Sequence, residues 1–414
     1  MTSTWRPRYY WPTPLEVASG YVLGSVEDGG AIAPDPPEVP PNESPRRVLE
    51  QILQEALQSP PCVVQFSGGR DSSLLLAIAT AVARREGLPL PIPCSFRYEG
   101  EPSTDESSWQ ELVIRHLGIE DWERLSVGEH YDMVGPLAQQ FLLQHGLVFP
   151  PTMYNNTLPM ALARGGSLIS GEGGDEILGY RRSRIAQKLL HDPRLILHRQ
   201  EIKEVALHLG PRPLRKAAWR HVIRRLVYSD QHMYLCPQVV EHMLDLISND
   251  LTCEPFMHSA SLSWHLRRRM VVKYQEARAA FAAENGSHHF DPLLEPRFVA
   301  SYARAVRPLG LLSRTEAMRL LVGDLLPDVV LGRTSKALFN RGFLTDVSRN
   351  FAKSWTGRGV DADLVDPEAL RAAWLSDWPP SQSFLLLQSA WLEEHGPQAP
   401  LKRSVSLAKQ GPPT

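Results

Sequence analysis

One short segment near residue 70 constrains the fold of this chain more than any other. It follows an apolar run at residues 62–66, precedes another at 74–79, and reads Ser67-Gly68-Gly69-Arg70-Asp71-Ser72-Ser73. Two adjacent glycines let the backbone turn tightly without the steric cost of a Cβ atom. Amide N–H groups of the loop and of the following helix N-terminus can then point at one anion, with serine hydroxyls beside them. The segment therefore predicts a strand, a tight loop and a helix that bind a nucleotide phosphate.

Residues 67–73, which we call the phosphate loop, differ from the Gly-x-x-x-x-Gly-Lys-Ser/Thr loop of kinase-like NTPases, because no lysine follows the glycines. Asp71 stands where cleavage of a triphosphate calls for a metal ligand. The loop resembles the pyrophosphatase-type loop (PP-loop) of the N-type ATP pyrophosphatases. This resemblance implies that ATP is a ligand and that its phosphates are bound by Ser67, Gly68, Gly69, Asp71, Ser72 and Ser73.

A second glycine-rich and acidic segment follows the short apolar run at residues 167–169. We call it the acidic loop, and it reads Ser170-Gly171-Glu172-Gly173-Gly174-Asp175-Glu176-Ile177-Leu178-Gly179-Tyr180. Loops at the carboxyl ends of neighbouring parallel strands converge on one ligand. Asp71 and Asp175 are then candidate ligands for one Mg²⁺ ion, which binds carboxylate and phosphate oxygens and keeps several waters. Taken alone, Asp175 and Glu176 are equally typical of a helix start, where the helix dipole favours acidic residues.

The phosphate loop and the acidic loop together resemble the synthetase domain of the asparagine synthetase family in their order and separation. A third segment is similar to the family's Leu-Pro…Arg…Lys…Phe segment, with the residues Leu326, Pro327, Arg333, Lys336 and Phe339. Lys336 is thus the counterpart of the family's catalytic lysine rather than a solvated surface residue. A fourth segment, Pro292-Leu293-Leu294-Glu295, resembles the family's Pro-Phe-Leu-Asp. The resemblance covers residues 46–345 in fragments.

The resemblance implies an ATP-dependent ligase that adenylates a carboxylate, releases pyrophosphate and passes the acyl group to an amine, with release of AMP. Loop amides, serine hydroxyls and Mg²⁺ would neutralise the departing pyrophosphate. Glu172 is a candidate base or amine-positioning group, and Lys336 a candidate to stabilise charge on the adenylate or the tetrahedral intermediate. By family position, ATP also contacts Gln65, Tyr98, Ser170 and Gly171. Gln65 and Tyr98 would flank the adenine, although both are equally explained as ordinary strand residues.

Two departures from the family pattern concern the nitrogen source and the acceptor. Family members that use glutamine begin with Met-Cys and carry a glutaminase domain of roughly two hundred residues, whereas this chain has Thr2 and about 60 residues before the phosphate loop. Glutamine hydrolysis is therefore not expected, and ammonia or an amine on the acceptor is the expected nitrogen source. Before Pro292 the family shows Glu-x-Arg where this chain has His288-His289-Phe290-Asp291, so a pocket for aspartate is not expected.

The expected organisation is an arm, an α/β core, a helical lobe and a tail. Residues 1–44 are predicted to form an aromatic and Pro-rich arm, extended over 34–41. Ser44 and Pro45 are typical of a helix start, and strands at 62–66, 92–96 and 167–169 alternate with helices. This alternation predicts a doubly wound parallel sheet over residues 45–185, an α/β fold of the PP-loop type. Residues 186–400 are expected to form a mostly helical lobe that carries Lys336, and residues 401–414 a disordered tail.

Composition limits the partners of the chain. Its 414 residues include 44 basic and 46 acidic side chains, so the formal net charge of −2 gives no global field to attract nucleic acid or an anionic membrane. No apolar run approaches the roughly 20 residues that cross a bilayer, and no signal-peptide core begins the sequence, so a cytoplasmic location is expected. The expected partners are ATP, a carboxylic acid and an amine, and the arm is a candidate surface for self-association or a partner protein.

Three functions are consistent with the sequence. The first is an amide-forming ligase of peptide or natural-product biosynthesis, like the lactam-forming and lasso-peptide-cyclising relatives of asparagine synthetase. The second is tRNA modification or thiolation by a PP-loop enzyme, which the neutral charge and the lack of paired catalytic cysteines disfavour. The third is a catalytically inactive binding module of the same fold, which the presence of Asp71, Asp175 and Lys336 disfavours.

Overall fold

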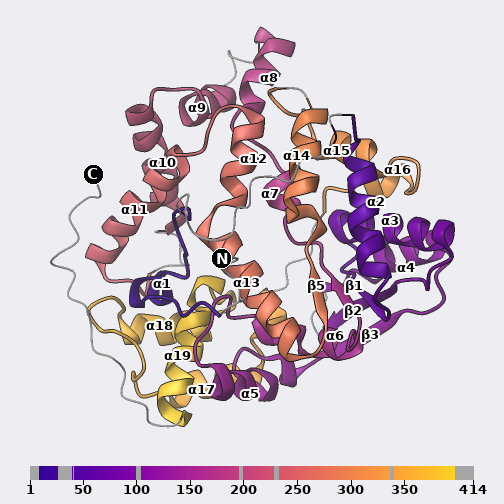
Figure 1. Ribbon diagram of the computed structural model, residues 1–414. Coiled ribbons are helices and arrows are strands. Elements are labelled where there is room, and N and C mark those ends of the chain that lie inside the picture. The colour runs from indigo at the N-terminus through magenta and orange to yellow at the C-terminus, as the bar shows by residue number, and fades with distance from the viewer. Residues whose placement is uncertain are drawn as a thin grey trace, which may run out of the picture.

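A five-stranded sheet lies at the centre of the computed structural model, which describes residues 9–26, 40, 42–98, 104–194, 199–227, 233–306, 308–335 and 340–396 (Figure 1). The strand order is β3-β2-β1-β4-β5, and every neighbouring pair is parallel. The strands are β1 (Cys62–Gln65), β2 (Ile92–Tyr98), β3 (Glu123–Val127), β4 (Ser167–Ile169) and β5 (His288–Phe290). The chain order reverses between β1 and β4, and in such sheets ligands bind beyond the carboxyl ends of the strands at this point.

Helices cover both faces of the sheet, because side chains along a strand point alternately to either side. Val64 of β1 and Ile169 of β4 pack against one group of helices, whereas Val63 and Leu168 pack against another. The predicted α/β fold, a doubly wound parallel sheet, is therefore confirmed. The predicted strands at 62–66, 92–96 and 167–169 correspond to β1, β2 and β4. β3 and β5 are additional strands whose partly exposed sequences lack an apolar run.

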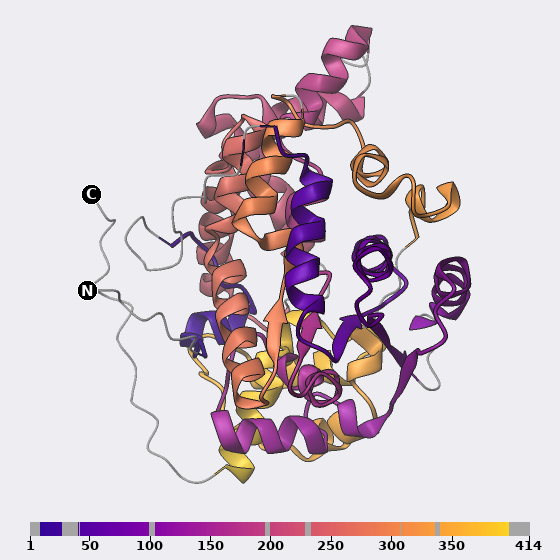
Figure 2. The same cartoon turned by 45° about the vertical axis from the view of Figure 1, so that its right-hand side comes forward.

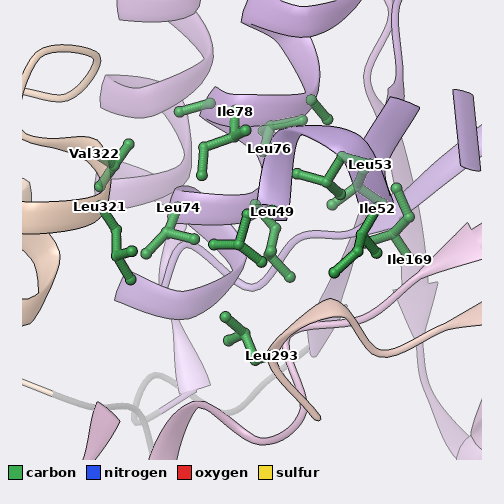
Figure 3. Close-up of a cluster of buried hydrophobic side chains, with 14 of the residues drawn as sticks. Leu49, Ile52, Leu53, Leu74, Leu76, Ile78, Ile169, Leu293, Leu321 and Val322 are labelled. Atoms are coloured by element: carbon green, nitrogen blue, oxygen red, sulfur yellow. The ribbon is translucent and has the colours of Figure 1, made fainter. Parts of the chain in front are cut away.

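The helices of the first face support the phosphate loop. Ser44 caps the first of them by accepting a hydrogen bond from the backbone N–H of Arg47, as the sequence predicts. Figure 3 shows Leu49 and Leu53 of this helix beside Leu74 of the next helix and Ile169 of β4. The helices of this face are α2 (Pro45–Leu57), α3 (Arg70–Glu86), α4 (Ser107–Leu117), α14 (Pro296–Ala305), α15 (Arg314–Val322) and α16 (Asp328–Leu331).

The second face is covered largely by helices from the end of the chain. Trp355 and Trp374 pack there with ring centroids 4.8 Å apart, and both side chains are buried. The elements of this face are η2 (Glu129–Tyr131), α5 (Pro136–His145), η3 (Met153–Asn156), α6 (Thr157–Leu162), α11 (Pro237–Thr252), α13 (Arg269–Glu284), α17 (Asp346–Ser354), α18 (Pro367–Leu375), η7 (Ser381–Ser383) and α19 (Phe384–His395).

The remaining elements are α1 (Pro14–Ser19), α7 (Gly174–Leu178), α8 (Arg184–His191), α9 (Arg199–His208), α10 (Arg212–Val227), α12 (His258–Leu266), η5 (Pro292–Leu294) and η6 (Asn340–Phe343). α8 and α5 lie at opposite ends of the molecule (Figure 1 and Figure 2). Of the remaining elements, α7, α12 and η5 contribute side chains to the core of the first face, and α1 and α10 to that of the second. Within the described ranges, every helix is too short or too polar to cross a membrane.

The two large apolar cores of the protein are each built from more than one of the predicted segments. Both large apolar clusters contain side chains from before and after residue 185, and β5 joins the sheet from the second half of the chain. In the predicted arm, Ala18 and Val22 are buried, and Tyr10 pairs with Phe149 in an antiparallel bridge. Residues 9–26 therefore pack on the protein itself. The Pro-rich run at 34–39, the tail at 401–414 and Lys336 lie outside the described residues.

Candidate active site

The phosphate loop and the acidic loop meet beyond the carboxyl ends of β1 and β4. A Cβ atom added to Gly174 would lie 2.2 Å from Cγ of Asp71. A Cβ atom on Gly171 would lie 3.2 Å from the backbone nitrogen of Ser72. Glycine in the acidic loop thus allows the two backbones to approach closely, so the structure brings together the two motifs that the sequence nominates.

Hydrogen bonds within the phosphate loop fix its shape. Gly68 adopts a φ of 80°, in the left-handed region that favours glycine. Ser72 Oγ accepts from the backbone N–H of Ser67 and donates to the carbonyl of Gly69, both at 3.2 Å. Gly69 precedes the first turn of α3 without a side-chain cap, so the first N–H groups of the helix can bind a phosphate. Ser73 is fully buried on α3, so the structure does not place its hydroxyl on the loop surface.

Arg314, in the first turn of α15, joins the two candidate metal ligands. Its Nη1 donates to Asp175 at 2.5 Å, and its Nη2 donates to Asp71. Burial raises the pKa of Asp71, and the Arg314 cation opposes this shift. One guanidinium can reach both carboxylates only when they lie side by side, so the pair fits a Mg²⁺ site in charge and position. Among the described residues no group of three His, Cys, Asp or Glu side chains could hold a metal ion, so phosphate oxygens and water would complete the coordination.

A buried polar network, centred on Arg278 of α13, lies beside the two loops. Arg278 Nη2 donates to Oε1 of Gln65 at 2.7 Å, and Nη1 donates to Oγ of Ser170 at 2.8 Å. The other end of the Gln65 side chain donates to Oδ1 of Asn156 at 2.8 Å. The polar groups of Gln65 and Ser170 are thus engaged within the protein, and a direct contact of either with ATP stays a prediction.

Asp291 supplies the negative charge of this network. It accepts hydrogen bonds from Ser170 Oγ, from Nη1 of Arg278 at 3.3 Å and from Nε2 of His289 at 2.9 Å. Burial alone would raise the pKa of Asp291, but His289 and Arg278 hold it well below its ordinary value, so the carboxylate is ionised. Burial lowers the pKa of His289, and the Asp291 charge opposes this shift. The network therefore contains a buried ion pair of Arg278 and Asp291, in which Nε of Arg278 and Nδ1 of His289 have no hydrogen-bond partner.

Glu172 stands at the exposed edge of this network. Its side chain is 46% exposed and lies 3.9 Å from Nη1 of Arg278. Tyr274 Oη donates to Oε1 of Glu172 at 3.1 Å. A carboxylate so placed can reach both solvent and a bound substrate, which a base or an amine-positioning group requires.

The segment that carries Lys336 is anchored on its N-terminal side by Arg333. Arg333 is buried, and its Nη1 donates to the carbonyl oxygen of Gly68 in the phosphate loop at 2.7 Å. Its Nη2 donates to Oε1 of Glu106 at 2.6 Å. Of the acidic pair Asp105-Glu106, Glu106 thus holds this arginine, while Asp105 accepts from the backbone N–H of Ser107 at the start of α4.

Tyr98 contacts the same segment on its C-terminal side. The Tyr98 ring packs edge-on against Phe343 with centroids 5.6 Å apart, and a Cβ on Gly342 would lie 2.3 Å from Cδ1 of Tyr98. Burial raises the pKa of the Tyr98 hydroxyl far above its ordinary value. Stacking of Tyr98 on adenine therefore stays a prediction, and so does the catalytic role of Lys336.

Sequence reasoning missed three charged residues of this region, namely Arg278, Asp291 and Arg314. Asp291 carried a signal, because it directly precedes the Pro292-Leu293-Leu294-Glu295 segment. Arg278 and Arg314 each stand in a helix that contains other arginines, and neither has a motif around it. Only the tertiary fold shows which arginine reaches the loops.

Comparison with known proteins agrees with this geometry. The model of the asparagine synthase family matches residues 45–393, which include both loops, β5 and the Arg333 segment. None of the curated proteins matches the chain. The chain therefore belongs to the asparagine synthase family, whose chemistry is that of ATP-dependent amide ligases.

Proposed function

We propose that this protein adenylates a substrate carboxylate with ATP and transfers the acyl group to an amine. The observation that carries this proposal is the meeting of Asp71 and Asp175 on one guanidinium, beside the N-terminus of α3. A helix N-terminus attracts phosphate, and paired aspartates attract the cation that accompanies it. Both lie where a doubly wound sheet binds its nucleotide.

In the first step, an oxygen of the substrate carboxylate attacks the α-phosphorus of ATP, and pyrophosphate leaves. The phosphate-loop amides and the hydroxyls of Ser67 and Ser72 would hold the departing phosphates, with Asp71 and Asp175 holding Mg²⁺. When bound, Mg²⁺ would neutralise charge on the phosphates. Arg314 would release the two aspartates before Mg²⁺ binds, because it occupies the same oxygens.

In the second step, the amine attacks the activated carbonyl carbon, and AMP leaves with one oxygen of the original carboxylate. Glu172 would accept the proton that the amine loses, since its carboxylate is exposed at the edge of the acidic loop. Lys336 would stabilise the charge on the adenylate or on the tetrahedral intermediate.

We infer further that the acceptor is not aspartate. Arg278 is already neutralised by Asp291, so this network offers no free cation to a second carboxylate on the acceptor. We propose instead an amine on a small molecule or peptide, and a role in peptide or natural-product biosynthesis without hydrolysis of glutamine.

The experiment is ATP turnover with pools of carboxylic acids, amines and peptides, followed by identification of the nucleotide products. Once an acid is found, the acid labelled with ¹⁸O in its carboxylate is supplied. We expect AMP and pyrophosphate, with one ¹⁸O atom in AMP, because the carboxylate oxygen bonds to the α-phosphorus. Ammonia and glutamine are supplied in parallel with the amines to identify the nitrogen donor.

The matched variants are Asp175→Asn and Asp324→Asn, since Asp324 is an exposed aspartate whose ion pair is with Arg46. Turnover should fall only in the first. Formation of ADP would contradict adenylation. Stimulation by tRNA instead of a carboxylic acid would favour the modification chemistry, and ATP binding without turnover would favour an inactive binding module.

A further inference from the structure

The guanidinium of Arg333 joins three parts of the protein that are far apart in the sequence. Its Nη1 donates to the carbonyl oxygen of Gly68 in the phosphate loop at 2.7 Å, and its Nη2 donates to Oε1 of Glu106 before α4 at 2.6 Å. Its Nε donates to Oγ of Ser335 at 3.1 Å. Ser335 directly precedes Lys336, the proposed catalytic lysine. One side chain therefore lies between the phosphate loop and the chain that carries Lys336.

The surroundings of Arg333 fix the place of its guanidinium. The side chain is only 3% exposed, and Glu106, which is 8% exposed, neutralises its charge. The guanidinium also stacks on the ring of Trp109, 4.6 Å from the centroid. Shortly before Arg333, Val330 and Leu331 of α16 are buried in the apolar core of the first face. Charge, stacking and the packing of the preceding helix thus hold the guanidinium in one position.

The part of the phosphate loop that Arg333 contacts is itself fixed. The carbonyl oxygen of Gly68 accepts from Arg333, and the N–H of Gly69 donates to Oγ of Ser67 at 3.2 Å. Because a peptide group is planar, these two hydrogen bonds set its orientation. Gln110 of α4 supports the same loop by donating to the carbonyl oxygen of Ser67 at 3.3 Å. Arg333 therefore relates the chain before Lys336 to a well-defined part of the loop.

A second anchor lies on the C-terminal side of Lys336. Asp132, which is buried in the loop after β3, accepts hydrogen bonds from the backbone N–H of Thr345 at 2.6 Å and from its hydroxyl at 2.7 Å. This anchor ties the chain after Lys336 to the loop beyond β3, whereas Arg333 ties the chain before it to the loop beyond β1. Of these two anchors, Arg333 is the one that relates Lys336 to the place where ATP phosphates would bind.

We propose that Arg333 is a positioning residue that sets the distance between Lys336 and the phosphates of ATP. The inference rests on the role that the proposed function gives to Lys336. A lysine stabilises developing charge only when its ammonium reaches the oxygen concerned, and a displacement of about 1 Å can cost roughly 100-fold in rate. Arg333 does not touch ATP in this role, because each nitrogen of its guanidinium is already bonded within the protein.

The first test is a double-variant cycle on ATP turnover with Arg333→Lys, Lys336→Met and the two combined. Arg333→Lys keeps the charge beside Glu106 but replaces the planar fork with one ammonium. We expect kcat to fall roughly 10- to 100-fold with an unchanged KM for ATP. In the combined variant, kcat should equal that of Lys336→Met alone, because residues that act as a unit are not additive. The control is Arg215→Lys in α10, since Arg215 is also buried and donates to a carbonyl oxygen, that of Thr252.

The second test needs no turnover. A non-hydrolysable ATP analogue bound at the phosphate loop should slow backbone hydrogen exchange in the peptide that covers residues 333–336, because Arg333 connects the two segments. The slowing should occur in the wild-type protein and in Arg215→Lys, but not in Arg333→Lys. The absence of slowing in the wild-type protein would overturn the proposal, and so would equal slowing in Arg333→Lys.

Ser335→Ala provides a second variant in case Arg333→Lys does not fold, since Ser335 is exposed. It removes one of the three contacts and should lower kcat about 3- to 10-fold. Thr334→Ala, a change at the exposed neighbouring residue, should leave kcat unchanged. Effects of Arg333→Lys and Lys336→Met that multiply in the combined variant would overturn the proposal, and so would a normal kcat in Arg333→Lys.

The outcomes separate this inference from the proposed function. Formation of ADP would contradict adenylation, while the same cycle, measured as ATP consumed, would still decide the role of Arg333. Normal turnover in Lys336→Met would overturn the proposed role of Lys336 and this inference with it. Turnover that depends on Lys336 but not on Arg333 would overturn this inference alone.

Discussion

Two arginines from the second half of the chain each join segments of the first half, but in different surroundings. Arg278 is buried, with hydrogen bonds to Gln65 and Ser170 and a charge that Asp291 neutralises. Arg314 is partly exposed and holds two carboxylates that would otherwise repel each other. Arg278 therefore belongs to the scaffold, whereas Arg314, under the proposed function, occupies the carboxylate oxygens that would bind Mg²⁺. Substitutions that affect stability and activity to different extents test this difference between Arg278 and Arg314.

The largest expected effect is on stability, from Asp291→Asn. This change leaves the Arg278 cation buried without its carboxylate, which costs about 3–5 kcal/mol. Urea unfolding followed by circular dichroism measures the loss. The control is Asp245→Asn, which removes an exposed partner of Arg220 and should cost about 1 kcal/mol or less. Equal losses in both variants would show that the Arg278 network is not a special part of the scaffold.

Asp175→Asn should instead lower activity much more than stability. Its side chain is 59% exposed, so the free energy of unfolding should change by about 1 kcal/mol or less. Turnover should fall roughly 10²-fold or more, because one of two metal ligands is lost. Steady-state kinetics across a Mg²⁺ series, paired with unfolding curves, checks both parts. A large loss of stability with normal turnover would assign Asp175 to the scaffold.

The stability of the protein should also depend on pH through His258. Burial lowers its pKa to about 4 from an ordinary value near 6.5. The unfolded chain therefore takes up a proton first, and stability falls as the pH drops from about 6.5 to about 4, by up to roughly 3 kcal/mol. His258→Leu should remove this part of the pH dependence in unfolding curves. An unchanged slope in the variant would mean that other groups cause the loss.

The smallest effect should come from Arg314→Met. Without the guanidinium, Asp71 and Asp175 face each other, and a part-exposed pair of like charges should cost about 1–2 kcal/mol. Mg²⁺ or Mn²⁺ should restore that loss in the variant and stabilise the wild-type protein less. Melting curves with and without the metal ion test this without turnover. If the metal ion raised the melting temperature of both proteins equally, Arg314 would not occupy the position of the metal ion.

Local signals made the fold and the loop part of the site predictable. The glycines and serines at 67–73, the glycines around Glu172 and the Ser44-Pro45 helix start all act through backbone geometry within a few residues. Arg278, Arg314 and Arg333 act across the fold, through contacts with the loops of the first half. Nothing near these arginines in the sequence identifies their distant partners. The same reasoning explains why Ser73 fits the motif, although α3 turns its side chain into the core.

The pairing of β5 with β4 has a consequence for how the site comes into being during synthesis. Ser167 pairs with His288, about 120 residues further along the chain. Until that strand emerges from the ribosome, β4 is an unprotected sheet edge, and such edges invite pairing with other chains. Arg278, Arg314 and Arg333 also emerge after β4. A nascent chain thus carries its acidic and phosphate loops before it carries the arginines that hold them. The two loops can therefore reach their final arrangement only after the second half of the chain has been synthesised.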